Sequence, residues 1–203
     1  MQVTLKTILN LKEKHPEFVY QDIRLDKMRI EVKVEPRKGS QGKCSGCHNR
    51  GPGYDSLPER EFIHVPLWGI PVIFLYRLRR LQCANCGVLA EVVPWSTGKS
   101  PLTTNYAWFL SEWAKLLSMQ EVARQFKSSW HYVFSAVAMA VEWGRERMDL
   151  SAIKAIGVDE IHWSTKLGFM TLVYQIDKHC KRLLWCGEKR TEKTIRGFFD
   201  WFG

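Results

Sequence analysis

The stretch Lys154-Ala-Ile-Gly-Val-Asp-Glu-Ile-His-Trp163 contains an apolar run that leads directly into two adjacent carboxylates, Asp159 and Glu160. Apolar alternation resumes from Phe169 to Ile176, so the segment is predicted to form a strand, a turn and a second strand. A carboxylate at the centre of a buried strand is costly unless it is paired or binds a metal ion. Asp159 is therefore the first candidate for a chemically active residue.

Asp159 is predicted to be a ligand for a divalent ion such as Mg²⁺ in a nuclease-like site. In phosphoryl-transfer nucleases, carboxylates on adjacent strands hold two such ions about 3.5–4 Å apart, next to the attacking and the leaving oxygen. Glu160 points to the opposite face of the strand and is expected to pair with a Lys or Arg. Asp177 precedes Lys178-His-Cys-Lys-Arg182 and is expected to be a hairpin carboxylate rather than a ligand. A single strand aspartate is a weak signal by itself.

Four of the six cysteines form two Cys-x-x-Cys pairs, Cys44-Ser-Gly-Cys47 and Cys83-Ala-Asn-Cys86. Two such turns complete a closed structural zinc site, and in a cytosolic chain they indicate metal rather than disulfides. The interval between the pairs exceeds the usual ~15–20 residues, but a strand hairpin can fill it. Structural zinc is predicted on four ligands: Cys44, Cys47, Cys83 and Cys86. The alternative is a set of unligated buried thiols; His48 and His64 are expected to be solvated.

Residues 1–95 are predicted to form a β-rich zinc-ribbon domain with an N-terminal extension. Strict alternation between residues 27 and 35 predicts a half-buried strand. The apolar face of that strand is expected to carry Met28, Ile30, Val32 and Val34. Two more strands are expected over residues 62–68 and 72–81, whereas residues 49–61 are polar and rich in Gly and Pro and are predicted to be a loop.

The period changes to that of a helix after Thr103. A first helix is indicated by an apolar stripe of Tyr106, Leu110, Trp113, Ala114 and Leu117. Ser118-Met-Gln-Glu121 has the form of a capping box and begins a short second helix. A third helix starts at Trp130 with the stripe Val133, Phe134, Val137, Ala138 and Val141. The order predicts a helix-turn-helix over residues 101–149; the alternative is a plain three-helix bundle.

A helix-turn-helix presents the start of its last helix to a DNA groove. The candidates for base contacts are Ser129, His131 and Tyr132. Phosphate contacts, which position a protein without reading sequence, are predicted for Arg77, Arg79, Arg80 and Lys99. The net charge of +9 is compatible with a polyanionic partner, although many basic proteins simply have solvated surfaces. Charge alone is therefore only a hint of DNA binding.

The ordered set of these motifs resembles the insertion-sequence transposases of the ISL-three group. Their chains combine an N-terminal zinc ribbon, a helix-turn-helix and a ribonuclease-H-like catalytic domain. Besides the cysteine pairs, the resemblance lies in Val65-Pro-Leu-Trp-Gly69, Glu91-Val-Val-Pro94, Ser118-Met-Gln-Glu-Val-Ala-Arg-Gln-Phe126, Ser129-Trp130, Ile156-Gly-Val-Asp-Glu160, Gly168-Phe-Met-Thr-Leu-Val173, Asp177 and Arg190. The cysteine pairs alone are common, whereas the ordered set is specific and covers most of the chain.

The resemblance implies a DDE-type transposase with an α+β multidomain fold, in which residues 153–203 form part of the ribonuclease-H-like α/β domain. Such enzymes use an Asp–Asp–Glu triad and Mg²⁺ to hydrolyse a phosphodiester at the element's end. The freed 3′-hydroxyl then attacks target DNA. Asp159 matches the first Asp of the triad. In the family pattern the other two carboxylates lie beyond Gly203, so we expect a truncated transposase that binds DNA and is inactive alone.

The expected partner is double-stranded DNA at the terminal inverted repeats of the element, and a homodimer is compatible with the chain. No stretch approaches the roughly 20 apolar residues that span a bilayer, and the N-terminus lacks a signal-peptide core. A bacterial cytoplasmic, nucleoid-associated protein with no membrane contact is therefore expected. Two alternatives remain from other classes: a zinc-containing helix-turn-helix regulator without catalysis, and a zinc-bound protein-interaction module.

Overall fold

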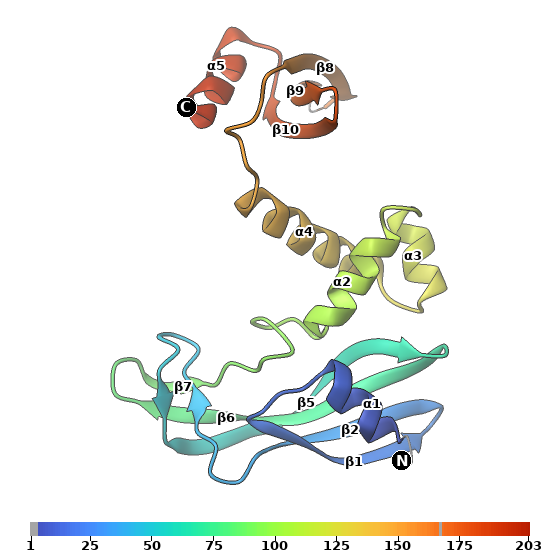
Figure 1. Cartoon of the computed structure of the whole chain (residues 1–203), viewed down its shortest axis with the longest axis vertical. Coiled ribbons are helices and arrows are strands. Elements are labelled where there is room, and N and C mark those ends of the chain that lie inside the picture. Colours follow the sequence, from blue (N-terminus) through green and yellow to red (C-terminus); the bar gives the residue numbers. More distant parts are fainter. Residues whose placement is uncertain (1–3, 167) are drawn as a thin grey trace. The chain divides into compact units, whose positions relative to one another are not determined.

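The computed structural model describes residues 4–166 and 168–203 and divides into two compact units, residues 1–143 and 144–203 (Figure 1). The first unit contains the predicted ribbon region, residues 1–95, together with the three predicted helices as far as Trp143. The second unit contains the acidic strand and its neighbours. No helix among the described residues is long and apolar enough to cross a bilayer.

The first unit is built on a five-stranded sheet preceded by helix α1 (Leu5–Lys12). Its strands are β1 (Phe18–Asp26), β2 (Arg29–Pro36), β5 (Gly53–Leu67), β6 (Ile70–Cys83) and β7 (Gly87–Ala90). The order is β1-β2-β6-β5, with β7 paired to β6; β2 and β6 run parallel and the other pairs antiparallel. The short strands β3 (Gly42–Lys43) and β4 (Arg50–Gly51) form a separate hairpin.

Two sequence-based expectations for this sheet are wrong. Met28 is 79% exposed because Lys27 and Met28 are the two residues of the β1–β2 turn, both with positive φ, as a type I′ hairpin requires. The predicted loop 49–61 is largely strand, since β5 begins at Gly53. Residues 53–59 are all exposed, so their sequence lacks the alternation of apolar and polar residues that indicates a half-buried strand. Hydrogen bonding to β6 keeps them extended.

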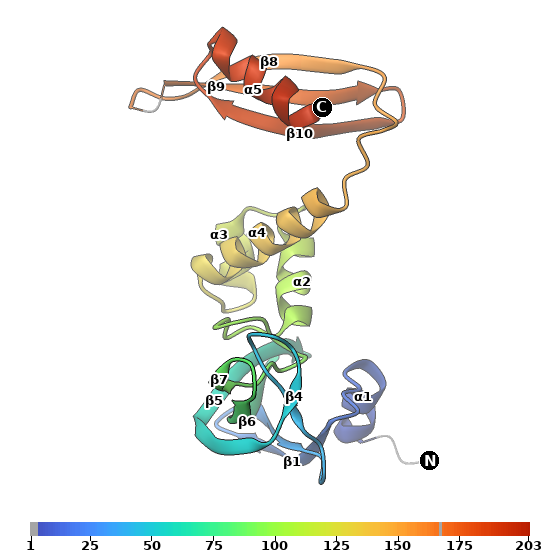
Figure 2. The same cartoon turned by 90° about the vertical axis from the view of Figure 1, so that its left-hand side faces the viewer.

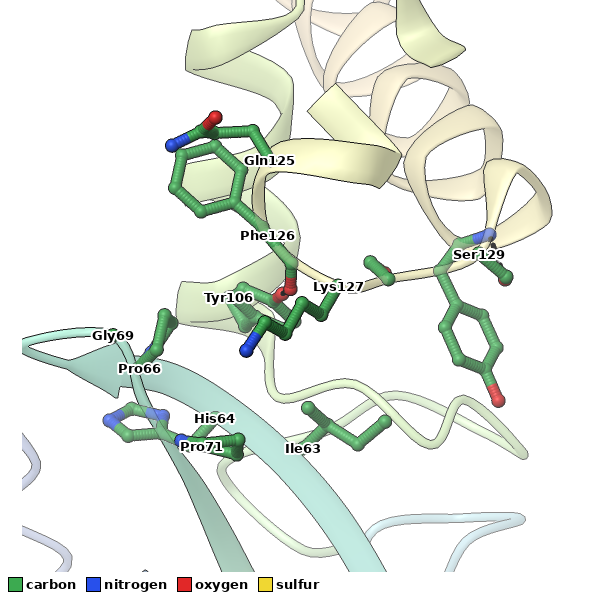
Figure 3. Close-up of a pocket in the computed structure, with 12 residues that line it drawn as sticks. Ile63, His64, Pro66, Gly69, Pro71, Tyr106, Gln125, Phe126, Lys127 and Ser129 are labelled. Atoms are coloured by element: carbon green, nitrogen blue, oxygen red, sulfur yellow. Dashed lines mark hydrogen bonds between the residues drawn. The ribbon is translucent and has the colours of Figure 1, made fainter. Parts of the chain in front are cut away.

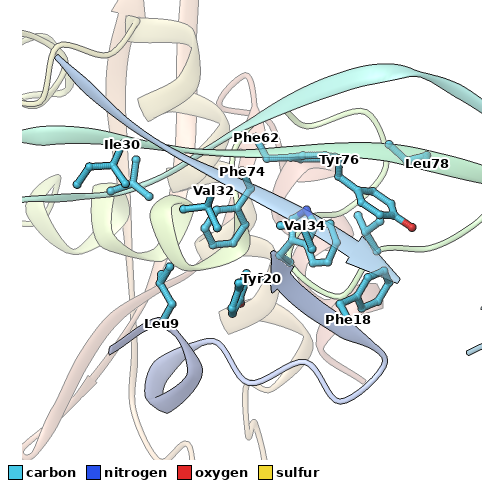
Figure 4. Close-up of a cluster of buried hydrophobic side chains, with 13 residues drawn as sticks. Leu9, Phe18, Tyr20, Ile30, Val32, Val34, Phe62, Phe74, Tyr76 and Leu78 are labelled. Carbon is cyan, nitrogen blue, oxygen red and sulfur yellow. The ribbon is translucent and has the colours of Figure 1, made fainter. Parts of the chain in front are cut away.

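The core of the sheet is a cluster of aromatic rings centred on Trp95, which is 2% exposed. The indole ring lies 4.8 Å from the ring of Phe18, 5.2 Å from that of Tyr76 and 5.9 Å from that of Phe62, all edge-on. Edge-to-face contacts of this kind stabilise beyond the area they bury. Figure 4 shows the cluster gathered between α1 and the sheet, with the predicted β2 residues Ile30, Val32 and Val34 on its inner face.

The three predicted helices are present as α2 (Thr104–Trp113), α3 (Met119–Gln125) and α4 (Trp130–Glu146). Thr103 caps α2, and the predicted capping box of Ser118 and Glu121 starts α3. The start of α2 is joined to the sheet, because Thr103 N donates to Ile63 O at 2.9 Å. Ile63 also packs against the helical core, so sheet and helices share one unit.

The apolar stripe of α4 differs from the prediction. Val133 and Ala136 are buried in the helical core, but Phe134 is 49% and Val141 55% exposed. The predicted spacing described two different faces of the helix, of which only the one with Val133 packs against α2 and α3. Two large apolar side chains of α4 are therefore left in solvent.

The second unit is an antiparallel sheet in the order β10-β9-β8, with α5 (Glu192–Phe202) packed against β9 and β10 (Figure 2). The strands are β8 (Ile156–Ser164), β9 (Gly168–Asp177) and β10 (Cys180–Glu188). Its core contains Val173, Leu184 and Phe198, onto which Ile195 and Phe202 pack. Phe199 of the same helix is 53% exposed.

Candidate metal centre and carboxylate site

The four predicted ligands, Cys44, Cys47, Cys83 and Cys86, come together, and their sulfur atoms all lie within 4.8 Å of one another. The first pair lies in the β3–β4 hairpin and the second joins β6 to β7. Tetrahedral zinc with Zn–S bonds of ~2.3 Å requires sulfur atoms about 3.8 Å apart. The Cys47 and Cys83 Sγ atoms are 3.5 Å apart, and none of the six cysteines is in a disulfide. The cluster therefore has the ligands and the spacing to hold a metal ion.

The two cysteine turns have matching backbone geometry. The residue after the second cysteine of each pair adopts positive φ, 60° at His48 and 74° at Gly87. Backbone N–H groups point at the sulfur atoms, as at Gly46 N, 3.4 Å from Cys44 Sγ. N–H groups of Asn85 and Cys86 lower the pKa of the Cys83 thiol to about 7. Thiolate is the metal-binding form of cysteine, so these N–H groups favour the ligating form of Cys83.

His64 takes no part in this cluster and is not solvated as expected. It is 8% exposed, and its Nδ1 lies 2.9 Å from the Thr103 hydroxyl. Burial lowers the pKa of the His64 imidazole. His64 is thus a residue of the junction between the sheet and α2.

A buried carboxylate, Glu91, joins the first cysteine turn to β6 and was not predicted as a site residue. Its backbone pairs with that of Cys44, and its fully buried side chain accepts hydrogen bonds from Tyr76 Oη at 2.6 Å and Arg79 Nη2 at 2.6 Å. Burial would lower the pKa of the Arg79 guanidinium, but the hydrogen bonds and charge of Glu91 raise it. This geometry gives Arg79, a predicted phosphate contact, a structural role beside the cysteine cluster.

Replacing Glu91 with glutamine is expected to destabilise the first unit by about 3–5 kcal/mol, because it leaves the part-buried Arg79 without its counter-ion. Tyr76→Phe removes a single hydrogen bond and should cost about 1–2 kcal/mol. Urea unfolding followed by circular dichroism, with metal release to a coloured chelator, measures both effects. The matched control is Asp55→Asn, which breaks the exposed ion pair with Arg80 in the same sheet. Equal unfolding midpoints for the Glu91 and Asp55 variants would contradict this role.

The remaining predicted phosphate contacts lie on the surface. Arg80 pairs with Asp55, and its guanidinium also lies over the Tyr54 ring at 5.6 Å. Arg77 and Lys99 are exposed. These three side chains are open to solvent or held only by exposed partners, so a polyanion has access to them.

The predicted base-contact residues lie at the start of α4. Ser129 Oγ accepts from Tyr132 N at 3.2 Å and so caps the helix, while His131 is exposed. Tyr132 is half-buried and packs against the helical core. Ser129 and Tyr132 also line a cavity of about 300 Å³ between the β5–β6 hairpin and the α3–α4 turn (Figure 3). Of the three, Ser129 and His131 are the exposed side chains.

Asp159 lies on β8 opposite Leu172 of β9 and is exposed, which corrects the expectation of a buried strand carboxylate. The neighbouring Val158 is also 52% exposed, and α5 packs against β9 and β10, so this part of β8 is open to solvent. The exposed carboxylate therefore needs no partner to offset desolvation. Its Oδ1 accepts from Glu160 N at 2.8 Å. Within residues 4–166 and 168–203, Asp159 belongs to no group of three or more potential metal ligands.

Asp177 has the hairpin role that was predicted for it. It ends β9 at the turn to β10, and its Oδ2 accepts from Gln175 Nε2 at 2.5 Å and Lys154 N at 3.3 Å. The Gln175 hydrogen bond is the largest cause of the lowered pKa of the Asp177 carboxyl. Asp177 therefore ties the chain that enters β8 to the β9–β10 hairpin.

Comparison with known proteins shows that the chain is similar to transposases. Residues 156–202, which span β8 to α5, match the ISL3 family of DDE transposases, described as a transposase family. The chain is also 26% identical over 158 residues to the transposase for insertion sequence element IS1001 of Bordetella parapertussis. That alignment covers 77% of this chain and 38% of the relative, so the chain spans less than half of the relative's length. No solved structure matches the chain.

Proposed function

We propose that this chain, a relative of the ISL3-family transposases, binds the terminal inverted repeats of an insertion sequence and belongs to a DNA-transposition system. The observation that carries the proposal is the family match over residues 156–202, because it includes the strand of Asp159. A regulator without any catalytic domain, the alternative reading of the chain, is not favoured because those residues match a transposase family.

In this proposal the four cysteines hold a structural zinc ion. A closed set of four thiolates suits zinc, and it leaves no open position for catalysis at that ion. The ion would hold the β3–β4 hairpin against the end of β6, and Glu91 also joins the first turn to β6. The ribbon then serves as a rigid platform for surface cations such as Arg77.

DNA binding is assigned to the helix-turn-helix made by α3 and α4. Two features support it: the capping box that fixes the start of α3, and the exposed polar residues at the start of α4. Ser129 and His131 are proposed to contact bases, while Arg77, Arg80 and Lys99 contact phosphates. Tyr132 is half-buried and would contribute through its exposed edge.

Asp159 is proposed to be one ligand of the Mg²⁺ ions that activate the attacking oxygen in the family's reaction. Its exposed position at the sheet edge leaves the carboxylate accessible to an ion and to DNA. One carboxylate cannot fix two ions, and residues 4–166 and 168–203 bring no set of three ligands to it. We therefore propose that this chain alone recognises element ends but does not cut them.

The test is a binding titration of the purified chain with a duplex carrying the repeat ends that flank its gene and with a scrambled duplex. Specific binding should be lost as salt rises, and Arg77→Ala should reduce the slope of log K against log salt by about 1. Incubation with Mg²⁺ should give no nicked product on a denaturing gel. Equal affinity for both duplexes would contradict the DNA-end proposal, and strand cleavage by this chain would contradict the single-carboxylate account.

A further inference from the structure

Three aromatic side chains form an exposed patch on the first turns of α4, which we name the α4 aromatic patch: Trp130, His131 and Phe134. Trp130 is 47% and Phe134 49% exposed, and their rings stack at 5.2 Å with an interplanar angle of 17°. The His131 ring meets Trp130 edge-on at 5.5 Å. The rings hold one another in place in solvent.

The patch has no role in holding the helices together. The core of the three helices takes Val133 and Ala136 from this part of α4, both at most 1% exposed. Apolar surface left in water forfeits about 25 cal/mol per Å² of burial. Two large stacked rings kept outside a core that is already complete point to a partner that covers them.

The charge around the patch favours a polyanion as that partner. Residues 122–141 contain no Asp or Glu, and they include Arg124 and Lys127, both exposed. Lys127 lies in the α3–α4 turn, three residues before Trp130, which is the first of the 17 residues of α4. An apolar surface on a helix start that follows two exposed cations and has no carboxylate within residues 122–141 suits a nucleic-acid groove, where phosphates lie beside the base edges.

We infer that Trp130 and Phe134 read thymine in the major groove by contact with its 5-methyl group. The inference rests on the proposed DNA binding and names what the start of α4 recognises. Phe134 has no hydrogen-bonding group, so it has no means of reading the donors and acceptors of a base edge. The thymine methyl is the one apolar feature of the major groove that distinguishes a base. Ser129 and His131 supply the polar contacts beside it.

The experiment replaces thymine by uracil, which differs only in lacking that methyl. Within the repeat-end duplex, thymines are exchanged one at a time, and binding is measured for the wild-type chain and for Trp130→Ala and Phe134→Ala. Each contacted methyl should be worth about fourfold in affinity, the value of one buried carbon group. The variants should bind thymine and uracil duplexes equally well. Val141→Ala, another exposed apolar position of α4, is the control and should retain the wild-type preference.

The outcomes separate this inference from the proposed function. Failure of the wild-type chain to bind any repeat-end duplex overturns the proposed function. Normal binding with no uracil effect, or with the same uracil effect in wild type and variants, overturns the methyl contact alone. A variant that changes the mass in solution by sedimentation while DNA affinity stays unchanged identifies the patch as a self-association surface and likewise overturns it. Circular dichroism confirms that each variant is folded.

Discussion

Replacement of Trp95 with alanine is expected to lower the free energy of unfolding of the first unit by about 3–5 kcal/mol. The indole is 2% exposed and makes edge-on contacts with Phe18, Phe62 and Tyr76, so its removal leaves a cavity that several rings line. The Trp95 carbonyl also accepts from Thr104 N at 2.8 Å, at the start of α2. Since a domain is stable by only about 5–15 kcal/mol, this loss is a large part of the total.

Urea unfolding followed by far-ultraviolet circular dichroism measures this effect without relying on tryptophan fluorescence. Trp95→Phe should cost less than the alanine variant, because the ring contacts are partly kept and the buried, unpartnered Nε1 is removed. Trp68→Ala is the matched control, since Trp68 is 87% exposed and its loss should change stability by no more than about 0.5 kcal/mol. Similar unfolding midpoints for the Trp95 and Trp68 alanine variants would show that Trp95 is not the centre of the core.

Substitution of Cys83 with serine is expected to abolish metal binding and to unfold the cysteine turns. Closed four-thiolate sites contribute about 10–16 kcal/mol of apparent binding free energy in zinc-finger peptides, so the turns have little reason to stay ordered without the ion. The loss should remain local to residues 42–51 and 83–91. The aromatic core around Trp95 contains none of the four ligands, so it should keep most of its packing.

Metal content by mass spectrometry should be one zinc ion per wild-type chain and close to none for the Cys83 variant. Hydrogen exchange should show lost protection in the two turns, whereas residues 62–78 of β5 and β6 remain protected. Cys186→Ser provides the control, because Cys186 lies outside the cluster and should leave the zinc content unchanged. A wild-type chain that is metal-free after purification with added zinc, or unchanged exchange after chelation, would contradict the metal centre.

Short-range patterns accounted for the parts of the fold that depend on neighbouring residues. The capping box of Ser118 and Glu121 marked the start of α3 to the residue, because a cap is formed by backbone and side chains within one turn. Each Cys-x-x-Cys pair was recognised as a turn for the same reason, since it is a local structure, whereas the meeting of the two turns depends on β6 and the β3–β4 hairpin. The strand of Asp159 was also found from the short apolar run that precedes the acidic pair.

The sequence-based predictions that were wrong or missing concern features that depend on contacts between distant segments. The exposed half of β5 carries no apolar pattern and exists only because β6 pairs with it. Phe134 has the spacing of a core residue, but α2 and α3 cover the adjacent face of α4. Glu91 gave no signal as a site residue, because its partners Tyr76 and Arg79 lie on another strand. Periodicity shows that a residue can be buried, and only the neighbouring element decides whether it is.

The sequence by itself indicated the two Cys-x-x-Cys turns, the three helices with the capping box of Ser118, and the acidic strand with its family resemblance, since each depends on residues close together in the chain. Only the tertiary structure decided that Asp159 is exposed on β8 and that Arg79 forms an ion pair with Glu91. It also decided that the side chains of Trp130 and Phe134 are exposed to solvent. These outcomes depend on strand order and on contacts between distant segments. The burial of a side chain and its ion-pair partner are set by such contacts, so a local sequence pattern does not specify them.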